Sequence, residues 1–260
     1  MPQSLQDAVS WLAAHPDEAP ALGAPLHPSK LGTKQHWDEV SHSLRTRSED
    51  VQRDWRQVGD QGEVWFGEDA SDVMVEWVQE HVPEKNAPLL DLGTGNGQLL
   101  FRFSEEGYAS LTGIDYSPSS IELAQSILST SEQDPRPSIN FFVADVLSAE
   151  PDSRLNDQGW KVLFDKGTYD AVCLNDEVDP KQGKRIGELY PMAVARLLDQ
   201  GAFFLITSCN WTRAELEKAF ITAETGLIFH SFVPRPSFSF GGSPGSSITT
   251  IAFQKNKTLA

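Results

Sequence analysis

A glycine-rich segment in the first half of the chain is the part best suited to binding a small molecule. The run Leu89-Leu90-Asp91-Leu92 leads into Gly93-Thr94-Gly95-Asn96-Gly97, and a second apolar run follows. Glycines at alternate positions let a ligand approach the backbone closely. Loops that bind a pyrophosphate use helix N–H groups and have little negative charge nearby, so Asp91 favours a cationic ligand. The segment predicts a site for S-adenosylmethionine, which carries an ammonium and a sulfonium but no phosphate.

Three more acidic residues follow predicted strands. Asp115, Asp145 and Asp165 each stand at or just after the end of an apolar run. Because the carboxyl ends of parallel strands share one edge of a sheet, we expect these side chains to meet there. Asp115 suits two hydrogen bonds to a ribose diol, Asp145 suits the adenine amino group, and Asp91 suits the methionine ammonium.

Each of these features alone also fits a plain turn or a helix cap. Their order and spacing together favour a cofactor that carries an adenosine. A nicotinamide dinucleotide is the alternative, but Asp91 and the G-x-G-x-G spacing disfavour it, since dinucleotide folds prefer G-x-G-x-x-G.

The elements that must position these residues alternate along the chain. Strands are predicted at 89–92, 110–115, 139–143, 160–164, 201–208, 227–233 and 248–253, and helices at 98–106, 118–128, 187–198 and 213–220. This alternation predicts an α/β fold with a Rossmann-like, seven-stranded, mainly parallel sheet and helices on both faces. No helix separates the last two strands, so we expect the last strand pair to be antiparallel.

The N-terminal part is expected to contribute an arm and a helical cap. Residues 1–32 hold five prolines and are interpreted as a flexible arm. Residues 33–260 are interpreted as a single domain, whose cap at 33–84 comprises one helix from Thr33 to about Val58 and a second that ends near His81.

The composition of the chain disfavours some classes of binding partner. The chain has 260 residues and a net charge of −16, which disfavours nucleic acid and anionic membranes because both require clustered Lys and Arg. Cys173 and Cys209 lack local His partners, so we expect buried, reduced thiols and no metal site. No apolar run is long enough to span a bilayer and no secretory signal is evident. The cytoplasm is therefore the expected compartment.

Several segments carry a resemblance to a known family. Asp91–Gly97 and Gly113–Pro118 resemble the class I, seven-stranded S-adenosylmethionine-dependent methyltransferases. More narrowly, four segments and one near the C-terminus are similar to the family that methylates lysine on translation elongation factor 1-alpha: Leu31–Asp38, Gly62–Glu68, Asp165–Asp170, Ile206–Trp211 and Phe238–Gly242. The resemblance runs from about Leu31 to Gln254. It implies a monomeric protein-lysine methyltransferase that uses S-adenosylmethionine. Ser41 stands where that family has a tyrosine, so no role is carried over there.

Site roles are assigned on this basis. Catalysis is assigned to Asp165, as proton acceptor or hydrogen-bond partner of the lysine amine, and to Asn210. Cofactor binding is assigned to Trp37, Asp91, Gly93, Thr94, Gly95, Asn96, Gly97, Asp115, Tyr116, Asp145 and Val146. Substrate binding is assigned to aromatic residues, at least one of which we expect to be core: Trp65, Phe66, Tyr169 and Trp211. Lys166 is expected to point outward, because a cation would repel a lysine substrate.

Two other functions compete with this one. The chain could be a small-molecule or RNA methyltransferase of the same fold, although its acidity disfavours RNA. It could also be a cofactor-binding scaffold without activity, which the full set of strand-end acids disfavours.

Overall fold

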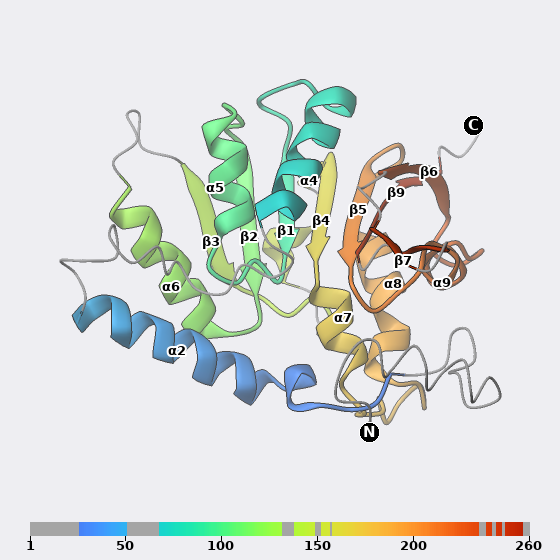
Figure 1. The fold of residues 1–260 in the computed structure, drawn as a ribbon, viewed down its shortest axis with the longest axis horizontal. Helices are drawn as coiled ribbons and strands as arrows, with labels where there is room; N and C mark the ends of the chain where they lie inside the picture. The colour runs from blue at the N-terminus through green and yellow to red at the C-terminus, as the bar shows by residue number, and fades with distance from the viewer. Residues whose placement is uncertain are drawn as a thin grey trace.

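A seven-stranded sheet forms the centre of the molecule (Figure 1). The computed structural model describes residues 26–50, 68–131, 138–148, 152–156, 158–233, 238–240, 243–245 and 248–256. The strand order is β3-β2-β1-β4-β5-β9-β6. The strands are β1 (Leu89–Leu92), β2 (Leu111–Asp115), β3 (Ile139–Val143), β4 (Val162–Lys166), β5 (Phe203–Ser208), β6 (Leu227–Val233) and β9 (Thr249–Lys255).

The first five strands run parallel, and β9 pairs antiparallel with both β5 and β6. Every residue of β1 and β2 is buried, as expected for parallel strands covered on both faces. The predicted fold class, including the antiparallel final pair, is confirmed.

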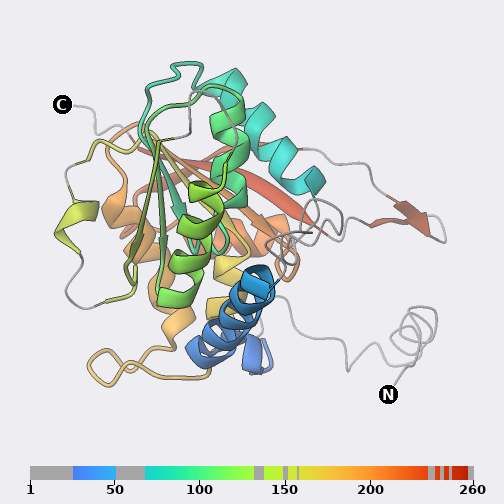
Figure 2. The same ribbon diagram turned by 90° about the vertical axis from the view of Figure 1, so that its left-hand side faces the viewer.

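Helices cover the two faces of the sheet (Figure 2). One hydrophobic cluster joins the strand residues on one face of the sheet, such as Leu89 and Phe164, to three helices. These helices are α4 (Glu68–His81), α5 (Gln98–Glu105) and α6 (Pro118–Ser129). The other cluster joins the alternate strand residues to helices on the opposite face. Those helices are α8 (Ile186–Leu197) and α9 (Arg213–Phe220).

The segment at η2 (Lys30–Gly32) and α2 (Lys34–Asp50) crosses the carboxyl ends of the strands (Figure 1). It is fixed at both sides of that edge. Ser41 Oγ and Ser120 Oγ of α6 are 2.8 Å apart, and the Ser117 hydroxyl donates to Asp38 over 2.5 Å. On the other side, Gly32 lies against the backbone that follows α7 (Thr168–Cys173), where a side chain would have no room.

Several elements differ from expectation. The fourth strand extends to Lys166 instead of ending at Phe164, and the short helix α7 was not predicted. A hairpin, β7 (Phe238–Phe240) with β8 (Ser243–Gly245), lies in what was expected to be a loop. The short 3-10 helix η3 (Ser153–Leu155) was not predicted either.

The expected N-terminal arm lies partly outside the described residues, which begin at residue 26. The remainder of that segment, through η2, packs against the residues that follow α7, where Ser29 N donates to Leu174 O over 3.2 Å. The first cap helix is described as far as Asp50, and the second ends at His81, as expected.

Candidate active site

A cavity of about 660 Å³ lies at the carboxyl ends of the strands, between the glycine-rich loop, α2 and α7. The residues expected to bind the cofactor line it, with the exception of Gly97: Trp37, Asp91, Gly93, Thr94, Gly95, Asn96, Asp115, Tyr116, Asp145 and Val146. Its size falls within the roughly 300–1,000 Å³ typical of small-molecule sites.

Two carboxylates hold the glycine-rich loop in shape. Asp115 accepts hydrogen bonds from Gly95 N over 3.0 Å and from Ser117 N over 2.9 Å. Asp91 accepts one from the Thr94 hydroxyl over 2.8 Å. Each carboxylate oxygen has two acceptor sites, so both acids retain capacity for a ligand. The loop is therefore preorganised by the acids that line the cavity.

The three glycines of the loop have different neighbours, although all have positive φ. A Cβ on Gly97 would lie 2.6 Å from the Phe141 ring, so this glycine serves packing against β3 and not the cavity. A Cβ on Gly95 would meet nothing within 4 Å. Gly95 is therefore the point at which a ligand has open access to the backbone.

Burial changes the ionisation of both acids. Desolvation raises the pKa of Asp91 to about 7 and that of Asp115 to about 6. The two acids are 3% and 7% exposed. A buried carboxylate with a raised pKa gains from a bound cation, which restores its charged form.

Asp165 lies beneath the cavity and does not line it. It has no exposed surface, and it accepts hydrogen bonds from Thr168 N, Tyr169 N and the Tyr190 hydroxyl over 2.8, 2.9 and 2.6 Å. Burial raises its pKa to about 7. These contacts fasten the start of α7 to the end of β4, and three donors occupy the carboxylate.

Lys166 corrects an expectation, because it lines the cavity instead of pointing outward. Side chains alternate along a strand, and the register pairs Asp91 with Phe164 and Leu92 with Asp165. Lys166 therefore leaves β4 on the face that Asp91 occupies, and Asp165 leaves it on the other. The alternation of side chains along a strand predicts this position of Lys166 only if β4 extends to Lys166.

A fourth buried acid joins two of the family-like segments. Asp170 accepts hydrogen bonds from the Ser208 hydroxyl over 2.5 Å and from Cys209 N over 2.9 Å. The same Ser208 oxygen accepts from Asn210 N and Trp211 N, over 3.2 and 3.1 Å. The loop after β5 is thus tied to α7, a role of Asp170 and Ser208 that sequence reasoning missed.

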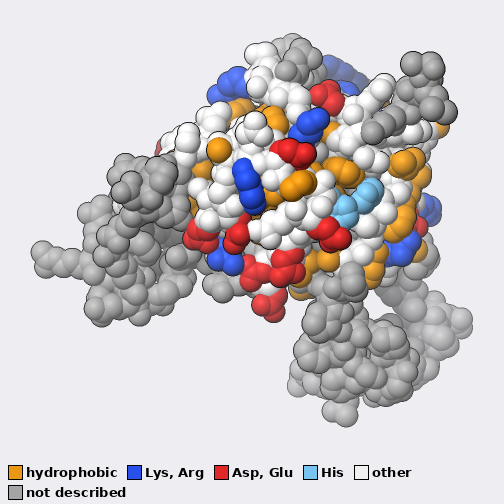
Figure 3. Space-filling view, turned by 90° about the horizontal axis from the view of Figure 1, so that it is seen from above, with side chains coloured by type: hydrophobic (Ala, Val, Ile, Leu, Met, Phe, Trp, Pro, Cys, Tyr) orange, Lys and Arg blue, Asp and Glu red, His pale blue; other side chains and the backbone are white. Residues whose placement is uncertain are grey.

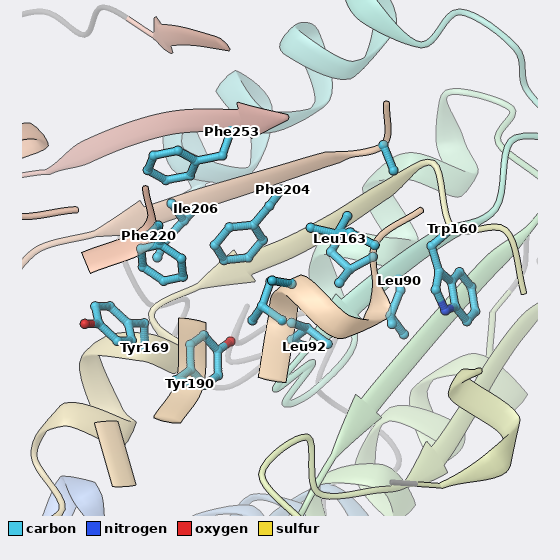
Figure 4. Close-up of a cluster of buried hydrophobic side chains, with 14 of the residues drawn as sticks. Leu90, Leu92, Trp160, Leu163, Tyr169, Tyr190, Phe204, Ile206, Phe220 and Phe253 are labelled. Atoms are coloured by element: carbon cyan, nitrogen blue, oxygen red, sulfur yellow. The ribbon is translucent and has the colours of Figure 1, made fainter. Parts of the chain in front are cut away.

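The residues expected to contact the substrate occupy different environments. Tyr169 is 5% exposed, and its ring lies 5.4 Å from that of Tyr190 and 5.0 Å from that of Phe220, so it belongs to the core (Figure 4). Trp211 is half-buried, and its Nε1 is buried with no hydrogen-bond partner among the described residues. Asn210 is exposed and does not line the cavity. Trp65 and Phe66 lie outside the described residues.

The N-terminal cap also contributes residues to the cavity wall, and no role was predicted for them. Thr33, Lys34 and Gln35 line it beside Trp37, whose indole nitrogen donates to Leu31 O over 2.8 Å. Their location in the family-like segment at 31–38 was the available signal.

Further observations concern the part of the chain that is described. No three His, Cys, Asp or Glu side chains there are grouped to hold a metal ion, and no helix there is long and apolar enough to cross a membrane. On the face seen in Figure 3, Lys and Arg side chains are scattered among acidic and hydrophobic ones. Both cysteines are free, but contrary to expectation Cys209 is exposed and Cys173 is only half-buried.

Known proteins with similar sequences are methyltransferases. A family model described as a methyltransferase domain matches residues 83–230. EEF1A lysine methyltransferase 2 of Mus musculus is 42% identical over 232 residues, which are 89% of this chain and 86% of the relative. The protein-lysine N-methyltransferase efm4 of Schizosaccharomyces pombe is 40% identical over 243 residues, 88% of this chain and 95% of the relative.

Solved structures share the fold at low sequence identity. Magnesium protoporphyrin IX methyltransferase (ChlM) from Synechocystis PCC 6803 with bound SAM matches with a TM-score of 0.52 and 14% identity, over 83% of this chain and 97% of that one. The [4+2]-cyclase SpnF matches with a TM-score of 0.53 and 16% identity, over 82% and 77%. The sheet order, the strand-end cavity and the sequence relatives agree, and the chain belongs to the class I methyltransferase family of EEF1A lysine methyltransferase 2 and efm4.

Proposed function

We propose that this protein transfers a methyl group from S-adenosylmethionine to a lysine of translation elongation factor 1-alpha. The proposal of this donor rests on the cavity, where Asp91, Asp115 and the open side of Gly95 lie together. The acceptor rests on the relatives, which match 88–89% of the chain and are named for EEF1A or for protein lysine. A translation factor as substrate implies a cytoplasmic reaction, and we include a monomeric enzyme in the proposal.

The donor fits the charges and shape of the cavity. Asp91 would hold the methionine ammonium, and Asp115 would accept two ribose hydroxyls with its remaining acceptor sites. Asp145, Val146 and Tyr116 would surround the adenine. When bound, the donor supplies an electrophilic methyl group, and this chain must align an acceptor with it.

The acceptor would approach the edge formed by β4 and β5. Asn210 and Trp211 stand there on the loop that Asp170 holds through Ser208. We propose that Asn210 binds the lysine amine or the substrate main chain, and that Trp211 lines the path of the lysine stem. Trp65 and Phe66 remain proposed for the same path. Tyr169 would support Trp211 from below, since their ring centroids are 5.7 Å apart.

Methyl transfer to lysine requires a neutral amine. The unperturbed pKa of lysine is about 10.4, so desolvation in the channel and loss of the proton to water must generate the nucleophile. We propose that Asp165 contributes by positioning: it holds α7, and with it the Gly167 and Thr168 backbone that lines the cavity. It is the weaker candidate for proton acceptor, because three donors occupy it.

A small-molecule or RNA methyltransferase is the second candidate, since this fold also carries other chemistry, as the cyclase SpnF illustrates. The first test incubates the protein with S-adenosylmethionine labelled in its methyl group and a lysate of cells that lack the enzyme. We expect one labelled protein band that co-migrates with elongation factor 1-alpha. Labelled nucleic acid or metabolite would favour the alternative, and no label at all would favour a scaffold.

Replacing Asp115 tests the donor site. Asp115→Ala removes two charge-assisted hydrogen bonds to ribose, each worth about 1.5–3 kcal/mol, so calorimetry should show S-adenosylmethionine binding weakened at least about a hundredfold. Asp199→Ala, at an exposed acid, should leave binding unchanged. Unaltered affinity in the Asp115 variant would refute the assignment.

Replacing Asp165 separates positioning from proton transfer. Asp165→Ala leaves two backbone N–H groups and a tyrosine hydroxyl without their buried acceptor, so urea unfolding should show a loss of about 2 kcal/mol or more along with lost turnover. Asp165→Asn, which keeps one acceptor oxygen, should lose less stability. Full stability combined with abolished turnover in both variants would instead identify a proton acceptor.

Donor binding should depend on pH through Asp91. Burial raises the pKa of Asp91 from its ordinary value of 3.8 to about 7 in the unliganded protein. Its proton therefore contributes stability that is fully present below about pH 3.8 and is lost as the pH rises from there through about 7. The donor ammonium competes with that proton. The rise in Tm on adding S-adenosylmethionine should therefore be larger at about pH 7.5 than at about pH 5.5, with affinity differing on the order of tenfold. A larger rise at the lower pH would contradict this role of Asp91.

A further inference from the structure

Part of the cavity wall has no role in the proposed binding of the donor. Most residues assigned to the donor follow β1, β2 or β3 along the chain. The wall continues on the other side of α7, along the later part of that helix and the chain that follows it. Five residues line the cavity there: Ala171, Val172, Asn175, Glu177 and Ile186. The cavity therefore extends beyond the contacts assigned to the donor.

Glu177 is the acid on this side, and it has no partner among the described residues. It lines the cavity and is also exposed, so it stands where the cavity opens to solvent. Its carboxylate forms no hydrogen bond or ion pair in the part of the chain that is described. Lys34, an exposed residue of the cavity wall in α2, is by contrast paired with Asp38 over 3.1 Å. The opening thus holds a carboxylate that is available to a cation.

A hairpin that begins at Glu177 and ends at Ile186 holds this acid in place. The Glu177 N–H donates to Asn175 Oδ1 over 2.7 Å, and the Glu177 carbonyl accepts from Ile186 N over 3.1 Å. Val178 pairs antiparallel with Arg185, and the hairpin projects at the lower left of Figure 2. These contacts use main-chain atoms of Glu177, so they fix its backbone and leave its carboxylate unoccupied.

The N-terminal cap touches the same segment just before the hairpin. A Cβ on Gly32 would lie 2.4 Å from Asn175 N, so the two backbones are in direct contact. On the same side, Ser29 N donates to Leu174 O. The cap and the segment after α7 therefore form one fixed rim, and Glu177 stands on it.

An acceptor lysine arrives at this rim as a cation. Its unperturbed pKa is about 10.4, so the side chain carries an ammonium at neutral pH, and removing that charge from water without a partner is costly. A carboxylate at the opening supplies a partner during entry. A carboxylate beside the reacting atoms would instead favour the charged amine, which cannot accept a methyl group.

We propose that Glu177 is an entry site for the acceptor, where its carboxylate pairs with the ammonium of the target lysine as that side chain passes into the cavity. The inference rests on the proposed function and identifies a specificity-determining residue for its acceptor. The pair forms before methyl transfer and breaks as the lysine moves inward, so Glu177 acts on acceptor binding and takes no part in the chemical step. The loop that carries Asn210 and Trp211 is held to the same helix through Asp170, so both proposed contacts with the acceptor depend on α7.

Steady-state kinetics with purified elongation factor 1-alpha and saturating S-adenosylmethionine test this role. Glu177→Gln removes the charge and retains both main-chain bonds, so KM for the acceptor should rise about three- to fivefold, the effect of one exposed ion pair, with kcat unchanged. Glu177→Lys should raise KM at least about tenfold, because it replaces attraction by repulsion. In about 0.5 M salt, KM of the wild-type protein should approach that of Glu177→Gln, because salt screens exposed charges.

Asp176→Asn is the matched control, because Asp176 is the adjacent exposed acid and does not line the cavity. It removes the same charge and should leave KM unchanged, and calorimetry should give one Kd for S-adenosylmethionine in all these variants. Three results would overturn the inference and leave the proposed function standing: an unchanged KM in Glu177→Gln, an equal rise of KM in Asp176→Asn, or a loss of kcat in place of a rise in KM. A wild-type protein that binds the donor but methylates no lysine of the factor would overturn both.

Discussion

Buried carboxylates at the ends of parallel strands hold the active edge of this molecule in shape. Asp115 fixes the glycine-rich loop, Asp165 fixes the start of α7, and Asp170 fixes the loop after β5. Burying an acid is costly unless donors compensate it, and each of these acids receives backbone N–H groups. The compensation makes the loops rigid before any ligand binds, and it leaves Asp91 and Asp115 poised to gain from a bound cation or hydroxyl.

The edge divides into a donor side and an acceptor side. The cavity in which the donor is proposed to bind is lined from the ends of β1, β2, β3 and β4 and from α2 and α7. β4 and β5 carry the segments that Asp170 and Ser208 link. Because of this link, a shift of the family-like segment at 165–170 would also move the family-like segment at 206–211. The reaction therefore depends on main-chain positions that three acids set.

The sheet and the cavity at the strand ends could be predicted from the sequence because they rest on local signals. Apolar runs predicted the strands, and the acids that end them predicted the cavity. The roles of Asp165 and Lys166 could not be predicted in this way. Their assignment depends on the face of β4 to which each side chain points. Because β4 ends two residues later than expected, Lys166 lies on the cavity side and Asp165 on the opposite side. Tyr169 was expected to contact the substrate, and its core position follows from α7, which was not predicted and which places the ring against Tyr190 and Phe220.

The proposed reaction has one chemical outcome, the appearance of methyl groups on a lysine of elongation factor 1-alpha. Mass spectrometry of purified elongation factor 1-alpha after incubation with the enzyme and S-adenosylmethionine tests it most directly. We expect one or more methyl groups on a defined lysine, and no modification when the Asp115→Ala variant replaces the wild-type enzyme. An unmodified substrate, in a reaction where the wild-type enzyme demonstrably binds the donor, would contradict the proposed acceptor.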